Sequence, residues 1–224
     1  MKWFFAILAL TLAVPALAGT PPQRLAPTAV TLPHVIPHLA VSVGRVQACG
    51  LTYDNTTNLT GYFYAPGAGV EVADDLHMIS GGHLCGADFV YYKSTTGTTV
   101  ATLTFYENDA TDTTFGPVLA GPYVISDLPN GFNSIHVNLA PGTGPPTLGA
   151  DIWLGVAFST AGTGLVMSDP PSMGSSDDLF METPPGMEYY FGGDPVASFG
   201  LAVYADIATP AKGSTWGRIK TLYR

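Results

Sequence analysis

The sequence predicts an all-β protein, an antiparallel two-sheet β-sandwich of jelly-roll-like arrangement. Short segments rich in Val, Ile, Tyr, Phe and Thr recur between Gly, Pro, Asn and Asp, which is typical of strands joined by turns. No internal stretch of twelve residues follows the 3.6-residue period of a helix. The 224 residues, 46% of them hydrophobic, suffice for one core but not comfortably for two domains. Many short strands in a single domain favour a sandwich.

The N-terminus predicts export. Lys2 precedes an apolar run over residues 3–14, and Ala16-Leu17-Ala18 has the small-x-small pattern of a cleavage site. Residues 1–18 are therefore expected to be a signal peptide, and the mature chain to be secreted or held at the cell surface. The run is too short for a transmembrane helix, and no later stretch predicts one in the mature chain.

Residues 19–40 form a proline-rich segment with a single charge, Arg24. Proline fixes φ and removes a backbone donor, so this segment is expected to be extended. Two interpretations stay open. The segment is an idle linker, or it is an arm that adds a strand to the sheet of a neighbouring copy and so builds a homo-oligomer or filament.

Residues 41–206 form the predicted sandwich domain. Residues 100–106 alternate apolar and polar side chains, as expected for a strand with one buried face. Trp153 lies in a nearly continuous apolar strand and is expected in the core. The predicted strands cover residues 41–48, 61–64, 70–79, 87–93, 98–106, 117–125, 132–139, 151–158, 164–168, 188–191 and 198–205.

The two cysteines, Cys49 and Cys85, are the only pair available for a disulfide. Export makes the bridge chemically permissible, and it would close a loop of about 36 residues. Two buried free thiols are the alternative.

A calcium site is predicted at Glu107, Asp109 and Asp112, which cluster between two predicted strands. Ca²⁺ takes six to eight oxygen ligands, and such loops supply them. A solvated hairpin loop is the alternative, because the spacing is not that of an EF-hand. Zinc would require His77 and His83 to meet in space, since their spacing matches no zinc template.

Outward-facing tyrosines are candidates for stacking on a sugar or on another subunit. Adjacent strand residues face opposite sides of a sheet, so each of the pairs Tyr91-Tyr92 and Tyr189-Tyr190 directs one ring outward. Tyr92, Tyr189 and Tyr190 are the candidate contacts. Asn55 and Asn58 each begin an N-glycosylation sequence, which indicates a surface loop.

The C-terminal segment 207–224 is predicted to be a basic, aromatic tail on an acidic body. It holds four bases and no acid, whereas residues 19–206 hold all 17 acids and three bases. Trp216, Arg218 and Lys220 are candidate contacts in this tail, which serves either as a sorting signal or as an assembly contact. The acidic balance excludes a nucleic-acid footprint.

Several segments together resemble uncharacterised secreted bacterial β-sandwich domains of surface and exported proteins, over about residues 50–206. The tail, of Thr-Trp-Gly-x-Ile-Lys type, is similar to short C-termini of exported bacterial proteins. The resemblance implies a fold and an extracellular address, and it supplies no catalytic residues. The segments are Tyr53-Asp-Asn, Gly61-Tyr-Phe-Tyr, Ala73-Asp-Asp-Leu76, Phe89-Val-Tyr-Tyr92, residues 102–109, 151–158 and 191–199, and the most specific one, residues 164–178.

These features favour a non-enzymatic extracellular structural or adhesive protein, self-assembling through its arm and tail. No nucleophile elbow, phosphate loop or dinucleotide motif occurs in the sequence. A glycan-binding module with structural calcium is the first alternative. A polysaccharide-acting hydrolase or lyase is the second, although among 17 acids any two can be named as its catalytic pair.

Overall fold

The computed structural model describes residues 23–24, 28–33, 36–43, 49–109, 114–139, 146–177, 179–183, 186–190 and 198–206. The predicted signal peptide and the tail with Trp216, Arg218 and Lys220 lie outside the described residues, as does Asp112. All regular elements of the described part are strands, so the prediction of an all-β fold is confirmed. Within the same residues, no helix has the length and apolar character to cross a membrane.

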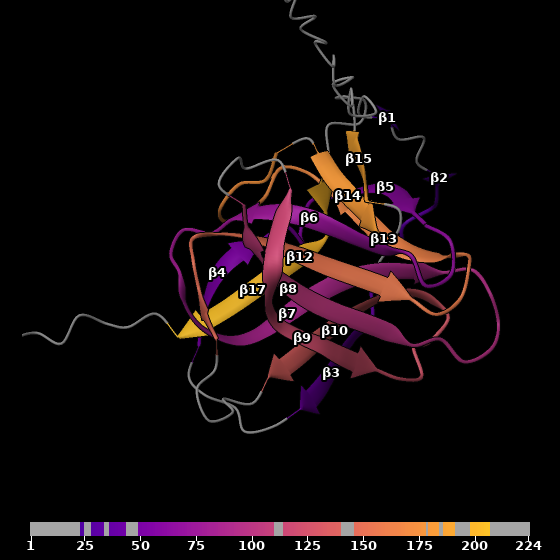
Figure 1. Cartoon of the computed structure of the whole chain (residues 1–224). Helices are drawn as coiled ribbons and strands as arrows, with labels where there is room; N and C mark the ends of the chain where they lie inside the picture. Colours follow the sequence, from indigo (N-terminus) through magenta and orange to yellow (C-terminus); the bar gives the residue numbers. More distant parts are fainter. Residues whose placement is uncertain are drawn as a thin grey trace, which may run out of the picture.

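The strands form two sheets, named sheet A and sheet B here (Figure 1). Sheet A has the order β1 (Gln23–Arg24), β15 (Met187–Tyr190), β14 (Leu179–Thr183), β6 (Glu71–His77), β12 (Asp151–Phe158), β8 (Ala101–Asn108) and β9 (Phe115–Ile125). Sheet B has the order β2 (Thr28–Ala29), β5 (Leu59–Tyr64), β13 (Thr163–Ser168), β7 (Gly82–Lys93), β10 (Gly131–Leu139) and β3 (His38–Val43). Sheet B also contains β4 (Gly50–Asp54), β11 (Thr147–Leu148), β16 (Ser198–Phe199) and β17 (Leu201–Asp206).

The predicted strands coincide with most of these elements, but the prediction omits five strands, β1, β2, β4, β11 and β14, and shifts one, β3. Three of the five, β1, β2 and β11, have only two residues each. β4 and β14 were not predicted, because each has only five residues and no run of β-branched side chains. β3 begins at His38, inside the segment expected to precede the domain. The pairing is antiparallel except for β3 with β10 and β1 with β15, which are parallel.

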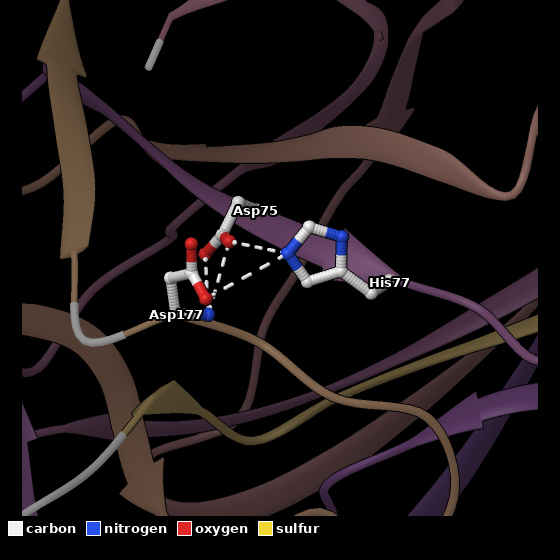
Figure 2. Close-up of side chains that lie close together, drawn as sticks. All are labelled: Asp75, His77 and Asp177. Carbon is white, nitrogen blue, oxygen red and sulfur yellow. Dashed lines mark hydrogen bonds and ion pairs between the residues drawn. The ribbon is translucent and has the colours of Figure 1, made fainter. Parts of the chain in front are cut away.

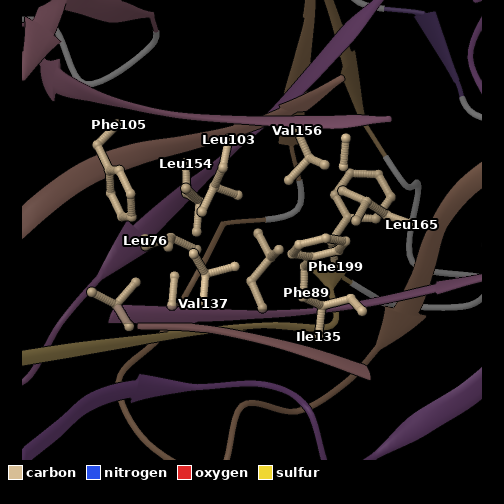
Figure 3. Packing of buried hydrophobic residues seen from close by; sticks show 14 of the residues in the cluster. Leu76, Phe89, Leu103, Phe105, Ile135, Val137, Leu154, Val156, Leu165 and Phe199 are labelled. Carbon is tan, nitrogen blue, oxygen red and sulfur yellow. The ribbon is translucent and has the colours of Figure 1, made fainter. Parts of the chain in front are cut away.

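The core lies between the sheets (Figure 3). Alternate residues of sheet A, such as Phe105 and Leu154, meet alternate residues of sheet B, such as Phe89 and Ile135. Trp153 is fully buried, as expected, but it belongs to a separate cluster on the opposite, outer face of sheet A. The two layers make the fold sandwich-like.

The N-terminal segment packs on its own chain. β2 and β3 occupy opposite edges of sheet B, and Val30, Leu32 and Ile36 lie between these strands in sequence. These three side chains pack on an apolar cluster of the outer face of sheet B, formed by Phe63, Val90, Phe132 and Val166. In the described residues the segment therefore acts as a strap across its own sheet.

The predicted disulfide is confirmed: Cys49 bonds to Cys85. It ties the residue before β4 to β7, the strand that pairs with β10, β11, β13 and β17.

Removing the disulfide is expected to lower the free energy of unfolding by about 4 kcal/mol, because the bridge joins residues 36 apart in sequence and so restricts the conformational entropy of the unfolded chain by that much. The double variant Cys49→Ser/Cys85→Ser tests this by urea unfolding of the mature chain. An unchanged unfolding midpoint in the variant would show that the bridge adds nothing to stability.

The strap predicts that alanine substitutions at two apolar residues, Ile36 and Leu39, differ in their effect on the free energy of unfolding. Ile36→Ala should cost about 1 kcal/mol, because the Ile36 side chain packs on the outer-face cluster. Leu39→Ala is the matched control, since 37% of Leu39 is exposed, and it should change stability by less than about 0.5 kcal/mol. Equal effects in chemical unfolding would contradict the strap.

Candidate functional site

The candidate site is a cluster of Asp75, His77 and Asp177 on the outer face of sheet A (Figure 2). Asp75 and His77 are two residues apart in β6 and therefore point to the same face. His77 Nε2 lies 3.3 Å from Asp75 Oδ2 and 3.8 Å from Asp177 Oδ1. One ligand atom from each residue lies within 4.8 Å of the other two, which suits a single metal ion.

Asp151 holds the imidazole from the opposite side. It is the cross-strand partner of His77 in β12, and its Oδ1 lies 2.8 Å from His77 Nδ1. An ionised carboxylate only accepts hydrogen bonds, so this contact places a proton on Nδ1. The Nε2 lone pair of a neutral imidazole then faces the two other carboxylates, an arrangement typical of a metal-binding histidine.

Asp177 reaches the cluster because the preceding residues pair with the ends of two strands, Met173 with Asp54 of β4 and Ser175 with His77 of β6. His77 N donates to Ser175 O at 2.8 Å, and Ser175 N donates to His77 O at 3.0 Å. Gly174 makes this approach feasible: its φ is +79°, and a Cβ there would lie 2.5 Å from His77 O. Asp177 N then donates to Asp75 Oδ2 at 3.0 Å.

The adjacent Asp74 points to the other face of sheet A, into the protein. Its Oδ2 accepts a hydrogen bond from Phe199 N at 2.9 Å, and its Oδ1 accepts one from Ser176 Oγ at 3.4 Å. Ser176 Oγ lies 3.2 Å from Asp75 Oδ1 as well. One loop hydroxyl thus lies within hydrogen-bonding distance of two neighbouring carboxyl groups.

The buried carboxyl groups favour their protonated forms. Burial raises the pKa of Asp75 to about 6, with a further increase from the charge of Asp177; the Asp177 amide and His77 oppose it. Burial and the nearby Asp75 raise the pKa of Asp74 well above its usual range. Burial lowers the pKa of His77, but its hydrogen bond to Asp151 and the surrounding carboxylates outweigh this and raise it. The environment of the cluster therefore favours bound protons on Asp74, Asp75 and His77.

The predicted calcium residues do not form this cluster. Glu107 is exposed and, with Asp151, lines a cavity of about 260 Å³. Asp109 donates its backbone N–H to Thr114 O at 3.2 Å. In the described part of the chain, Asp75, His77 and Asp177 are the only three such side chains close enough to share an ion. Calcium at Glu107 and Asp109 stays a prediction.

His83 lies apart from this cluster. Its Nδ1 is 3.1 Å from Thr147 Oγ1, whereas His77 faces three aspartates. His77 therefore has carboxylate neighbours, and the pairing of His77 with His83 that was considered for zinc is not among the described contacts of His83.

The predicted tyrosine contacts differ in their surroundings. Tyr92 packs against Phe63 and Phe132, with ring centroids 4.9 and 4.7 Å apart, in the cluster that the strap covers. Tyr189 stacks on Phe180 at 5.3 Å. Tyr190 is 38% exposed and is the one of the three open to a flat ligand.

The interpretation of Asn55 as a surface acceptor is wrong, whereas Asn58 is exposed. Asn55 is fully buried, and its Nδ2 donates to Ser198 Oγ at 2.8 Å and to Ser168 O at 3.0 Å. The amide that a glycan would modify is used to join separate strands.

Sequence reasoning missed the cluster as a unit, although each part was visible. An Asp-x-His spacing in a strand places both side chains on one face, which was the available signal. Nothing in the sequence indicated that Asp151 is the cross-strand partner of His77, or that residues 172–177 return to β6.

Comparison with protein-family models, curated proteins and solved structures finds no match to this chain.

The cluster predicts that, without divalent cations, stability falls as the pH rises from about 4 to above 6. An unfolded aspartate loses its proton near pH 4, whereas folded Asp75 keeps it to about pH 6, so the folded state binds the extra proton in this window. The raised pKa values of Asp74 and His77 act in the same direction. Asp75 should contribute about 3 kcal/mol to this change in the free energy of unfolding.

Urea unfolding in EDTA between pH 4.5 and 8 measures this slope. Asp75→Asn should flatten it, and Glu107→Gln, which removes an exposed carboxylate outside the cluster, should not. A slope that Asp75→Asn leaves unchanged would contradict the assignment.

Proposed function

We propose that the protein is an exported, non-enzymatic β-sandwich module with a structural or adhesive role, in which a divalent cation bound by Asp75, His77 and Asp177 fastens residues 172–177 to β6. The observation that carries the proposal is the orientation of His77. Its Nδ1 is directed to Asp151 and its Nε2 to two carboxylates. A cation at Nε2 would replace the protons that the cluster otherwise needs.

The order of the strands supports a jelly-roll-like arrangement for this module. β5, β13, β7 and β10 are neighbours in sheet B, and β6, β12, β8 and β9 are neighbours in sheet A. The chain passes from one sheet to the other between β5 and β6, between β6 and β7, and between β7 and β8. It crosses again between β9 and β10, between β11 and β12, and between β12 and β13. Eight strands alternating in this manner are the pattern of two Greek keys wound together.

The donor set favours zinc over calcium. One imidazole nitrogen with carboxylate oxygens suits Zn²⁺, whereas Ca²⁺ prefers oxygen ligands alone. The Asp75 side chain is only 4% exposed and the His77 side chain 23%, but that of Asp177 is 59% exposed. The protein would thus supply three ligands, with water completing the coordination.

The location supports fastening as the cation's role. Asp75 and His77 belong to β6, a central strand of sheet A, while Asp177 belongs to a connection between β13 and β14. A shared ion would cross-link residues about 100 positions apart in sequence. An exported module with little surface charge gains stability from such a link, as it does from the disulfide.

Zinc added to the EDTA-treated protein at pH 7.5 should raise the free energy of unfolding by about 2.7 kcal/mol at about 100 times its Kd. His77→Ala and Asp177→Asn should abolish this increase, and His83→Ala, which removes a histidine outside the cluster, should preserve it. Binding measured by calorimetry should release protons. Zinc binding that persists in His77→Ala, or no binding by the unmodified chain, would refute the proposal.

A further inference from the structure

The outer face of sheet A contains a second feature, a cavity of about 390 Å³. This volume lies within the range of about 300–1,000 Å³ that small-molecule sites occupy. It shares no residue with the Asp75–His77–Asp177 cluster. Its polar and aromatic lining comes from Glu71, Thr102, Tyr106, Ser159 and Thr183.

The cavity lies where neighbouring strands carry small residues at their outward positions. Ala157 of β12 and Thr102 of β8 are cross-strand partners, and both line the cavity. The adjacent row, which does not line it, consists of the partners Ala73, Gly155 and Thr104 of β6, β12 and β8. Side chains of this size leave the outer face hollow where longer polar side chains ordinarily cover a solvated sheet.

Glu71 lies across this hollow and is held there. A Cβ on Gly155 would come within 2.6 Å of Glu71 Cδ, so glycine is required for the Glu71 side chain to pass over β12. Glu71 Oε1 then accepts a hydrogen bond from Tyr106 Oη at 2.5 Å. The carboxyl group is thereby fixed in a single orientation beside the cavity.

Glu71 is buried without a basic partner. It is 8% exposed, and the ion pairs in the described part of the chain are all between histidine and aspartate. Burial raises the pKa of Glu71 although hydrogen bonds from Tyr106 and Thr104 lower it. A buried carboxyl group beside an open cavity can be compensated by hydroxyl groups of a ligand.

We propose that this cavity binds a neutral saccharide segment, with Glu71 accepting hydrogen bonds from sugar hydroxyls. The hydroxyls of Thr102, Ser159 and Thr183 provide further donors and acceptors, and the Tyr106 ring offers an apolar surface for the C–H groups of the sugar. An anionic sugar is disfavoured, because the lining includes a carboxyl group and no base. The inference is independent of cation binding.

Calorimetry of the mature protein in EDTA tests the site. The probes are cellohexaose, xylohexaose, mannohexaose and N-acetylchitohexaose, with oligogalacturonate as the anionic comparison. At least one neutral probe should bind, and Glu71→Gln should weaken it at least tenfold, because a hydrogen bond to a charged acceptor is replaced by a neutral one. Glu107→Gln, with the same change of charge at an exposed residue, should bind like the unmodified chain.

Thr102→Val gives a second measurement that does not depend on the Glu71 variant being folded. It keeps the shape of the side chain, removes one hydroxyl from the cavity and should weaken binding about fivefold. Failure of every neutral probe, preference for oligogalacturonate, or binding that neither variant weakens would overturn the inference. Because EDTA is present throughout, zinc binding can fail or succeed independently of this result.

Discussion

The burial of apolar side chains between sheet A and sheet B is the constraint on which the rest of the structure depends. Strand residues alternate between two faces, so once Val72, Leu76 and Leu154 enter the core, the residues directly before and after each of them must face outward. Glu71, Asp75, His77 and Asp151 therefore share one face because of the core. A one-residue slip of β6 would bury these side chains and disperse both candidate sites.

The same alternation explains why Asp74 is fully buried, although burying a carboxyl group is energetically unfavourable. Its position in β6 directs it inward, where Phe199 N and Ser176 Oγ supply hydrogen bonds. Residues 172–177 are therefore not a simple connection between β13 and β14. They supply donors to two adjacent carboxyl groups on opposite sides of the sheet, and a cation would reinforce a link that hydrogen bonds already make.

The fold was largely predictable from the sequence, but the candidate site was not. Alternating segments such as Ala101–Asn108 determine strands through local composition, and a chain with only two cysteines allows one internal bridge. The register that places Asp151 opposite His77 depends instead on long-range pairing. The proline-rich segment was ambiguous for the same reason: its composition predicts extended backbone, but the apolar cluster that it covers is assembled from distant strands.

The outer faces of the two sheets differ in how far side chains of the chain itself cover and pair with their polar and apolar groups, and this difference is why both proposals place binding on sheet A. On sheet B, the strap covers the apolar cluster, and the polar side chains bond to one another: Asp88 contacts His136 and accepts a hydrogen bond from Tyr204 Oη at 2.9 Å. On sheet A, His77 Nε2 faces carboxylates and Glu71 is buried beside a cavity without a base. Buried carboxyl groups that no lysine or arginine neutralises are where protons, cations or ligand hydroxyls can add the most stabilisation.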